Sequence, residues 1–187
     1  MEIYLIRHTK PHITTNLCYG HTDLPLADSF ADEWASLQRR IPLHFDAVYS
    51  SPLKRCHELA KLLTTKHLIV SEHLKELNFG HWEMKEWDKI DQLAFGNWMN
   101  NFVEVCVPGG ESFRDLSGRV DKFFAELSRT SYETVAIVSH AGTIRTILAM
   151  ILGMPLQNAF HFEIDYGSVS HLKFSGEMKR IKAVNLK

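Results

Sequence analysis

The sequence has few cysteines and almost no net charge. Cys18, Cys56 and Cys106 are the three cysteines among 187 residues, and their wide spacing predicts free thiols rather than a disulfide framework or a zinc ribbon. The formal net charge of −1 gives no general attraction to nucleic acid or to an anionic membrane. Any positive charge that acts in function is therefore expected to be local.

Glycine-rich nucleotide motifs, metal-ligand spacings and long apolar runs are missing too. There is neither a P-loop nor a G-x-G-x-x-G pattern, which argues against binding of ATP or dinucleotides. The 11 histidines form no H-E-x-x-H or similar set, so we expect no metal and no cofactor. The most apolar stretch, residues 144–152, is far shorter than the ~20 residues of a membrane span. Because residues 1–4 show no signal-peptide features, we expect a reduced, cytoplasmic protein.

The remaining composition is that of a soluble globular protein, with 45% hydrophobic and 23% charged residues. A chain of this length is expected to fold as a single domain, residues 1–187. Alternation of strands with helices predicts a three-layer α/β/α sandwich with a mostly parallel central sheet. The expected strands are residues 3–6, 46–49, 68–70, 134–138, 160–164 and 168–174, and the expected helices are residues 28–40, 51–63, 86–102, 111–127 and 142–152.

Two histidines each follow a buried apolar run. Residues 3–6 lead into Arg7 and His8, and residues 134–138 lead towards His140. If both runs are neighbouring strands of a parallel sheet, their carboxyl ends place the two imidazoles in one crevice. Imidazole has an unperturbed pKa near 6.5, so its neutral, attacking form is available at cellular pH. The pattern favours attack by His8 on phosphorus within a cluster of positive charge.

Two predicted helix starts face the same edge of the sheet. Ser51 and Pro52 are typical of a serine cap with proline at the first helical position, which places Arg55 in the first turn. Small residues after His140 let a ligand approach the backbone. Helix amino ends carry unpaired N–H groups that suit phosphate. We therefore expect the phosphoryl group to be surrounded by Arg7, Arg55 and His140.

The leaving oxygen of a phosphate monoester needs a proton, and three carboxyl groups are candidates for its donor. Glu76 lies within residues 74–83, and we favour it as the general acid. Glu83 closes the same stretch, and Glu111 follows a Pro-Gly-Gly breaker. Spacing alone does not choose among the three.

Taken together, these residues resemble the histidine phosphatase superfamily, which also contains the cofactor-dependent phosphoglycerate mutases. Arg7 and His8 match the R-H-G signature of that family, with Thr9 in place of the glycine. The resemblance covers residues 3 to about 170. It implies a phosphoglycerate mutase-like fold and a phosphohistidine intermediate. The second arginine of the family pattern corresponds to Arg55, the acid to Glu76 and the second histidine to His140.

Within the superfamily, residues 7–11, 18–26, 50–56 and 165–169 are similar to the α-ribazole phosphatases. That resemblance implies removal of the 5′-phosphate of α-ribazole 5′-phosphate, a small phosphomonoester, during assembly of the cobalamin nucleotide loop. Four aromatic rings could stack on the base, namely Tyr19, Phe79, Trp82 and Trp98. Core packing is the alternative for most of them. Other substrate contacts are expected from Thr9, Tyr19, Gly20 and Ala141.

Other functions remain open at this point. One is a broad-specificity sugar-phosphate phosphatase or a phosphoglycerate mutase-like enzyme of the same superfamily. Another is a non-catalytic module that binds a phosphorylated ligand, and a third is a metal-dependent hydrolase. No nucleic-acid or membrane partner is predicted, and an exposed edge strand could support a homodimer.

Overall fold

The strands form one twisted sheet at the centre of the molecule. The computed structural model describes residues 1–14 and 16–187, and within them the sheet has six strands in the order β3-β2-β4-β1-β5-β6. β1 to β4 run parallel to one another, whereas β5 runs antiparallel to both of its neighbours, β1 and β6. The expected, mostly parallel sheet is therefore confirmed. The strands are β1 (Glu2–Arg7), β2 (Ala47–Ser50), β3 (Leu68–Val70), β4 (Thr134–Ser139), β5 (Val169–Ser175) and β6 (Met178–Leu186).

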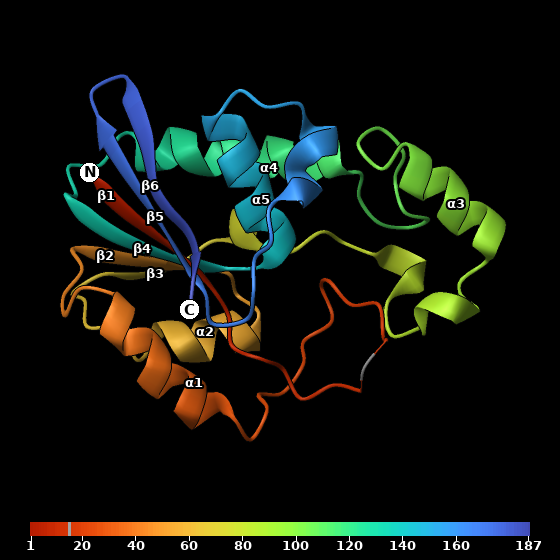
Figure 1. Ribbon diagram of the computed structural model, residues 1–187, viewed down its shortest axis with the longest axis horizontal. Helices are drawn as coiled ribbons and strands as arrows, with labels where there is room; N and C mark the ends of the chain where they lie inside the picture. Colours follow the sequence, from red (N-terminus) through yellow and green to blue (C-terminus); the bar gives the residue numbers. More distant parts are fainter. Residues whose placement is uncertain (15) are drawn as a thin grey trace.

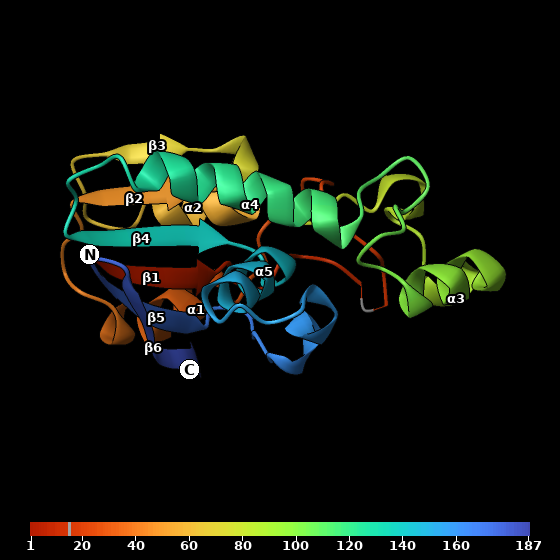
Figure 2. The same ribbon diagram turned by 90° about the horizontal axis from the view of Figure 1, so that it is seen from above.

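Helices cover both faces of this sheet, which gives the three predicted layers. α4 (Phe113–Leu127) and α5 (Ala141–Ile151) lie on one face, and α1 (Phe30–Leu37) and α2 (Lys54–Ala60) lie on the other (Figures 1 and 2). α3 (Gln92–Asn100) lies apart from the sheet, at the right of both views.

Alternation of apolar side chains along the central strands produces a core on each face. In β1, Ile3 and Leu5 pack under α4 and α5, whereas Ile6 packs on the side of α1 and α2. In β4, Val135 packs on the side of α4 and α5, whereas Val138 packs on the side of α1 and α2. A strand that is buried on both faces must be apolar throughout, which explains the continuous apolar runs in the sequence.

Three sequence-based predictions of local structure are wrong. α2 begins at Lys54 with Leu53 as its N-cap residue, so Ser51 and Pro52 do not open the helix. The helix ends at Ala60 rather than at residue 63, and Leu62, which lies beyond that end, is 42% exposed. The predicted strand over residues 160–164 is absent from the described residues, because a 3₁₀ helix spans Leu156–His161 instead. Alternation of apolar residues over so few positions does not separate these conformations.

Other elements were predicted with the wrong extent. The helix expected over residues 86–102 is shorter: a 3₁₀ turn at Trp87–Lys89 precedes α3, whose N-cap residue Asp91 accepts a hydrogen bond from the Ala94 amide at 2.7 Å. β6 was not predicted. It is an exposed edge strand with many charged residues, so it lacks the apolar pattern that reveals a buried strand.

Candidate active site

The carboxyl edge of the sheet brings the two predicted histidines together. Arg7 at the end of β1 pairs in register with Ser139 at the end of β4, so His8 and His140 leave the sheet side by side. Their ring centroids are 5.1 Å apart. Only 2% of His8 and none of His140 is exposed. The expectation that neighbouring parallel strands deliver both imidazoles to one crevice is confirmed.

Local contacts fix the protonation state of His8. Its Nδ1 lies 2.7 Å from the carbonyl oxygen of Thr9. Because a carbonyl oxygen only accepts, Nδ1 carries the proton and Nε2 keeps the lone pair. Burial, followed by the charges of Arg55 and Arg7, holds the pKa of His8 well below its usual 6.5. His8 is therefore a neutral imidazole with a nucleophilic Nε2.

His140 is the N-cap residue of α5, and its ring contacts the side chains of Ser51 and Cys56. Its Nε2 lies 2.8 Å from Ser51 Oγ and 3.4 Å from Cys56 Sγ. Burial, followed by the charge of Arg55, holds its pKa well below 6.5. Ser51 thus contacts the second histidine rather than capping α2.

Two arginines lie beside the histidine pair, each with part of its guanidinium used by the protein. Arg55, which is completely buried, donates to the carbonyl oxygens of Thr22 at 2.9 Å and Gly20 at 2.6 Å. Arg7 donates to the Ile164 carbonyl at 2.6 Å. The buried Nε of each arginine has no hydrogen-bond partner among the described residues. Unpaired buried N–H groups on two cations fit a site that takes up an oxyanion.

Two tyrosines complete the inner wall. The Arg7 guanidinium carbon lies 3.7 Å from the ring centroid of Tyr166, and that of Arg55 lies 5.3 Å from Tyr19. The two tyrosine hydroxyls are 2.5 Å apart. Burial, together with this hydrogen bond, raises the pKa of Tyr19, so its phenol stays neutral beside the cations.

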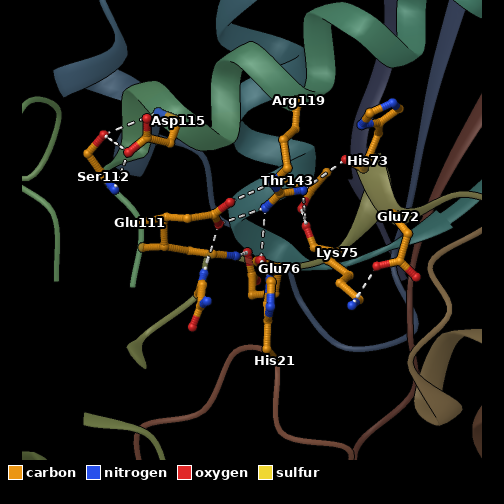
Figure 3. A network of polar contacts seen from close by, with 12 residues as sticks. His21, Glu72, His73, Lys75, Glu76, Glu111, Ser112, Asp115, Arg119 and Thr143 are labelled. Atoms are coloured by element: carbon orange, nitrogen blue, oxygen red, sulfur yellow. Dashed lines mark hydrogen bonds and ion pairs between the residues drawn. The ribbon is translucent and has the colours of Figure 1, made fainter. Parts of the chain in front are cut away.

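The three candidate carboxyl groups have different surroundings. Glu76 lines the cavity, where its Oε2 accepts from the Gly142 amide at 3.0 Å and its Oε1 from the Leu77 amide at 2.9 Å. Glu111 forms an ion pair with Arg119 at 2.7 Å and lies outside the cavity lining (Figure 3). Glu76 is therefore the candidate that lines the same cavity as the two histidines.

Glu83 is engaged by backbone donors. Its carboxylate accepts from the amides of His21 at 2.7 Å and Thr22 at 2.5 Å. Burial opposes its ionisation, but the hydrogen bonds from Thr22, His21 and Phe79 outweigh burial and lower its pKa. Glu83 thus stays an anion that holds the loop before α1.

These groups surround a cavity of about 420 Å³. Its described lining carries four basic side chains, Arg7, Lys10, Arg55 and Arg145, and one carboxyl group, Glu76. The local positive charge expected from a nearly neutral chain is therefore present here. The rest of the lining is His8, Ile13, Thr14, Asn16, Leu17, Tyr19, Phe79, Trp87, His140 and Tyr166.

Some predicted contacts lie elsewhere, and others were missed. Of the expected aromatic rings, Tyr19 and Phe79 line the cavity, whereas Trp82 and Trp98 are buried in the core and 4% exposed. Thr9, Gly20 and Ala141 are absent from the described lining; the Thr9 and Gly20 carbonyls instead accept from His8 and Arg55. Lining residues that were not predicted are Lys10, Ile13, Thr14, Asn16, Leu17, Trp87, Arg145 and Tyr166. Lys10 and Tyr166 fall within the stretches that carry the family resemblance, which was the available signal.

A larger hollow of about 670 Å³ lies at the opposite edge of the sheet, between residues 44–46, 64–67 and 131–134. Its described lining contains no arginine, and neither His8 nor His140 is part of it. Across the described part of the chain, no group of three or more His, Cys, Asp or Glu side chains is arranged to hold a metal ion. None of the described helices combines the length and apolar character that crossing a bilayer requires.

Known proteins are similar to this chain over most of its length. The family model of the histidine phosphatase superfamily (branch 1) matches residues 3–187. An adenosylcobalamin/alpha-ribazole phosphatase of Escherichia coli is 28% identical, over 99% of this chain and 96% of that protein. A phosphoserine phosphatase 1 of Hydrogenobacter thermophilus is 28% identical over 76% of this chain and 71% of that protein. The crystal structure of the alpha-ribazole phosphatase from Shigella flexneri superimposes with a TM-score of 0.91 at 28% identity, covering 100% of this chain and 96% of that one.

The family match therefore agrees with the paired histidines, the two arginines and the three-layer fold. The chain belongs to the histidine phosphatase superfamily, branch 1.

Proposed function

We propose that this protein hydrolyses a phosphomonoester through a phosphohistidine on His8, and that its substrate is α-ribazole 5′-phosphate. The observation that carries the chemistry is the state of His8: a buried neutral imidazole that donates its Nδ1–H to the Thr9 carbonyl and lines the same cavity as Arg7 and Arg55. A nucleophile fixed in its attacking tautomer needs no deprotonation before it reacts.

In the first step, Nε2 of His8 attacks phosphorus and the bond from phosphorus to the ester oxygen breaks. The Glu76 carboxyl group gives its proton to that departing oxygen. Arg7, Arg55 and His140 surround the transferring phosphoryl group and stabilise the charge on its oxygens. Because these groups are already fixed by protein contacts, little reorganisation accompanies the transfer.

In the second step, water attacks phosphorus and the N–P bond breaks, which returns the lone pair to Nε2. The Glu76 carboxylate takes the proton from that water and is ready for the next cycle. Inorganic phosphate then leaves. The cycle balances without a metal ion or a cofactor.

The α-ribazole assignment is supported by relatives and by the outer cavity wall. Proteins described as alpha-ribazole phosphatases match nearly the full chain in sequence and in structure. Ile13, Leu17, Phe79 and Trp87 give the cavity an apolar side, which suits a flat aromatic base attached to the ribose.

A second candidate is a phosphomonoesterase of broader specificity that accepts substrates with a carboxylate, such as phosphoserine or phosphoglycerate. Lys10 and Arg145 favour it, since they add two cations to the cavity beyond those near the histidines. A cation that is not needed for the phosphoryl group can bind a carboxylate of the substrate.

The deciding measurement is kcat/KM for α-ribazole 5′-phosphate beside phosphoserine, 3-phosphoglycerate and simple sugar phosphates, without added metal. We expect a preference of about 10²-fold or more for the riboside phosphate, the scale that specific side-chain contacts supply. Similar rates on every substrate would keep the phosphohistidine chemistry and reject the α-ribazole assignment.

The nucleophile is tested by His8→Ala, which we expect to lower kcat by roughly 10⁴-fold or more, as removal of a nucleophile typically does. His12→Ala is the matched control, because His12 is exposed and lies outside the cavity lining. Rapid quenching should also trap an acid-labile, base-stable phosphoryl label on the native protein but not on the His8 variant. Near-normal turnover by His8→Ala would refute the mechanism and point to catalysis by another residue.

A further inference from the structure

The candidate acid lies on a segment that has little regular structure of its own. Residues 75–79 are neither helix nor strand, and only a 3₁₀ turn at Glu72–Leu74 links them to β3. Backbone carbonyls in such a segment need partners from elsewhere. The position of the Glu76 carboxyl group therefore depends on what binds the neighbouring carbonyl oxygens.

Several side chains supply such partners: Thr143 Oγ1 donates to the Lys75 carbonyl, and His21 Nε2 lies beside the Glu76 carbonyl, each at 2.8 Å. Arg119 binds three of the carbonyl oxygens. Its guanidinium donates to the carbonyl oxygens of His73 at 3.0 Å, Lys75 at 3.2 Å and Glu76 at 3.1 Å (Figure 3). The remaining donors bind the Glu111 carboxylate at 2.7 and 2.9 Å. One rigid, planar side chain thus fixes three carbonyls around the candidate acid, which a flexible ammonium does not achieve.

Arg119 is itself well anchored. It belongs to α4, whose first turn is closed by a reciprocal pair of hydrogen bonds between Ser112 and Asp115. The Glu111 backbone amide donates to the Asn78 carbonyl at 2.9 Å, and the Asn78 amide donates to the Glu111 carboxylate at 3.0 Å. The guanidinium and its carboxylate partner are therefore tied both to a rigid helix and to the segment that they hold.

Arg119 does not line the cavity, so it does not act by touching the substrate. We propose that Arg119, oriented by Glu111, is a positioning residue that sets the carboxyl group of Glu76 for proton transfer to the leaving oxygen. This inference rests on the proposed role of Glu76 as the general acid. It also gives Glu111, the rival candidate for that role, a different part in the same reaction.

The chemistry of the leaving group separates positioning from general stability. An alkoxide is a poor leaving group and needs the proton from Glu76, whereas 4-nitrophenolate leaves without one. Displacing the acid by about 1 Å can cost about 10²-fold in rate when the proton is needed. Loss of folded protein instead lowers the rates on both kinds of ester equally.

The experiment compares kcat/KM for 2-phenylethyl phosphate with kcat/KM for 4-nitrophenyl phosphate. We expect Arg119→Met to lower the first by about 10²-fold and to change the second far less, in the same pattern as Glu76→Gln. Arg114→Met is the matched control: Arg114 lies on the same helix in an exposed ion pair with Glu104. This control should leave the ratio of the two constants unchanged.

Arg119→Lys guards against misfolding, since it keeps the charge opposite Glu111 but cannot bind all three carbonyls at once. It should show a smaller loss with the same selectivity for the alkyl ester. The double variant Glu76→Gln with Arg119→Met should lose little more than Glu76→Gln alone, because both changes remove one function.

Two other outcomes separate a failure of the positioning inference from a failure of the proposed role of Glu76. If Glu76→Gln is selective for the alkyl ester but both Arg119 variants affect the two esters equally, the positioning inference is wrong and the proposed function stands. If Glu76→Gln lowers both esters equally, the general-acid role of Glu76 fails, and the inference fails with it.

Discussion

At the scale of single residues, Gly142 shows how the structure changes the meaning of a motif. The small residues after His140 were expected to let a ligand approach the backbone. The structure instead places the Glu76 carboxylate there, accepting from the Gly142 amide at 3.0 Å. A Cβ atom on Gly142 would lie 2.3 Å from Glu76 Oε1. The glycine is therefore needed for the close approach of a neighbouring side chain.

Gly142→Ala should separate activity from stability. The carboxylate can move aside, and alanine favours a helix by up to about 1 kcal/mol over glycine, so we expect an unchanged or slightly higher Tm. The displaced acid should lower kcat for an alkyl phosphate by about 10²-fold. Gly118→Ala in α4 is the control, because nothing lies within 4 Å of its new Cβ. Full activity in Gly142→Ala would mean that this contact does not position the acid.

At the scale of elements, the sequence predicted correctly the strands whose burial is visible in their apolar residues. β1 and β4 were predicted because strands that are buried on both faces must be apolar throughout. Ser51 and Pro52 failed as a helix start because the hydroxyl of Ser51 contacts His140, a partner 89 residues away in the chain. A capping motif predicts a helix start only when no distant group binds the serine.

α4 has a complete capping box, and its contribution can be measured. Ser112 Oγ accepts from the Asp115 amide at 3.2 Å, and the Asp115 carboxylate accepts from the Ser112 amide at 2.9 Å. Ser112→Ala should lower the free energy of unfolding by about 1 kcal/mol, the usual cost of losing an N-cap. Ser117→Ala, in the middle of the same helix, should change it by less than about 0.5 kcal/mol. Equal effects of the two changes in urea unfolding would show that the cap is not stabilising.

At the scale of the whole molecule, two buried neutral histidines couple stability to pH. The pKa values of His8 and His140 are depressed in the folded state and return to about 6.5 in the unfolded chain. Below pH 6.5 the unfolded state therefore binds more protons than the folded state. The stability from these groups is complete above pH 6.5 and is lost as the pH falls below it.

We expect the free energy of unfolding to fall between pH 7 and pH 5.5, with a slope that approaches about 1.4 kcal/mol per pH unit for each histidine. His140→Gln should reduce this slope by up to one such increment, because glutamine does not titrate. Denaturant unfolding at several pH values measures this slope for the native protein and for the His140 variant. A stability that stays constant over this interval would contradict the depressed pKa values.

Much of the fold and the chemistry was determined by sequence. Apolar runs that end in His8 and His140 predicted strands and the crevice between them, because a parallel sheet places its carboxyl ends together. Arg7 was found for the same reason, whereas Arg55 was found through the predicted start of a helix and through the family resemblance. That the chain is a single domain, and that it forms homodimers, remain predictions.

Only the tertiary structure decided which carboxyl group stands at the cavity. Glu76, Glu83 and Glu111 are alike in sequence, and what separates them is a set of contacts with His21, Thr22, Arg119 and Gly142. The same holds for Trp87 and Arg145, which reach the cavity because of how their segments pack. Periodicity reports burial along one segment, whereas a site made from several segments depends on their contacts across the fold.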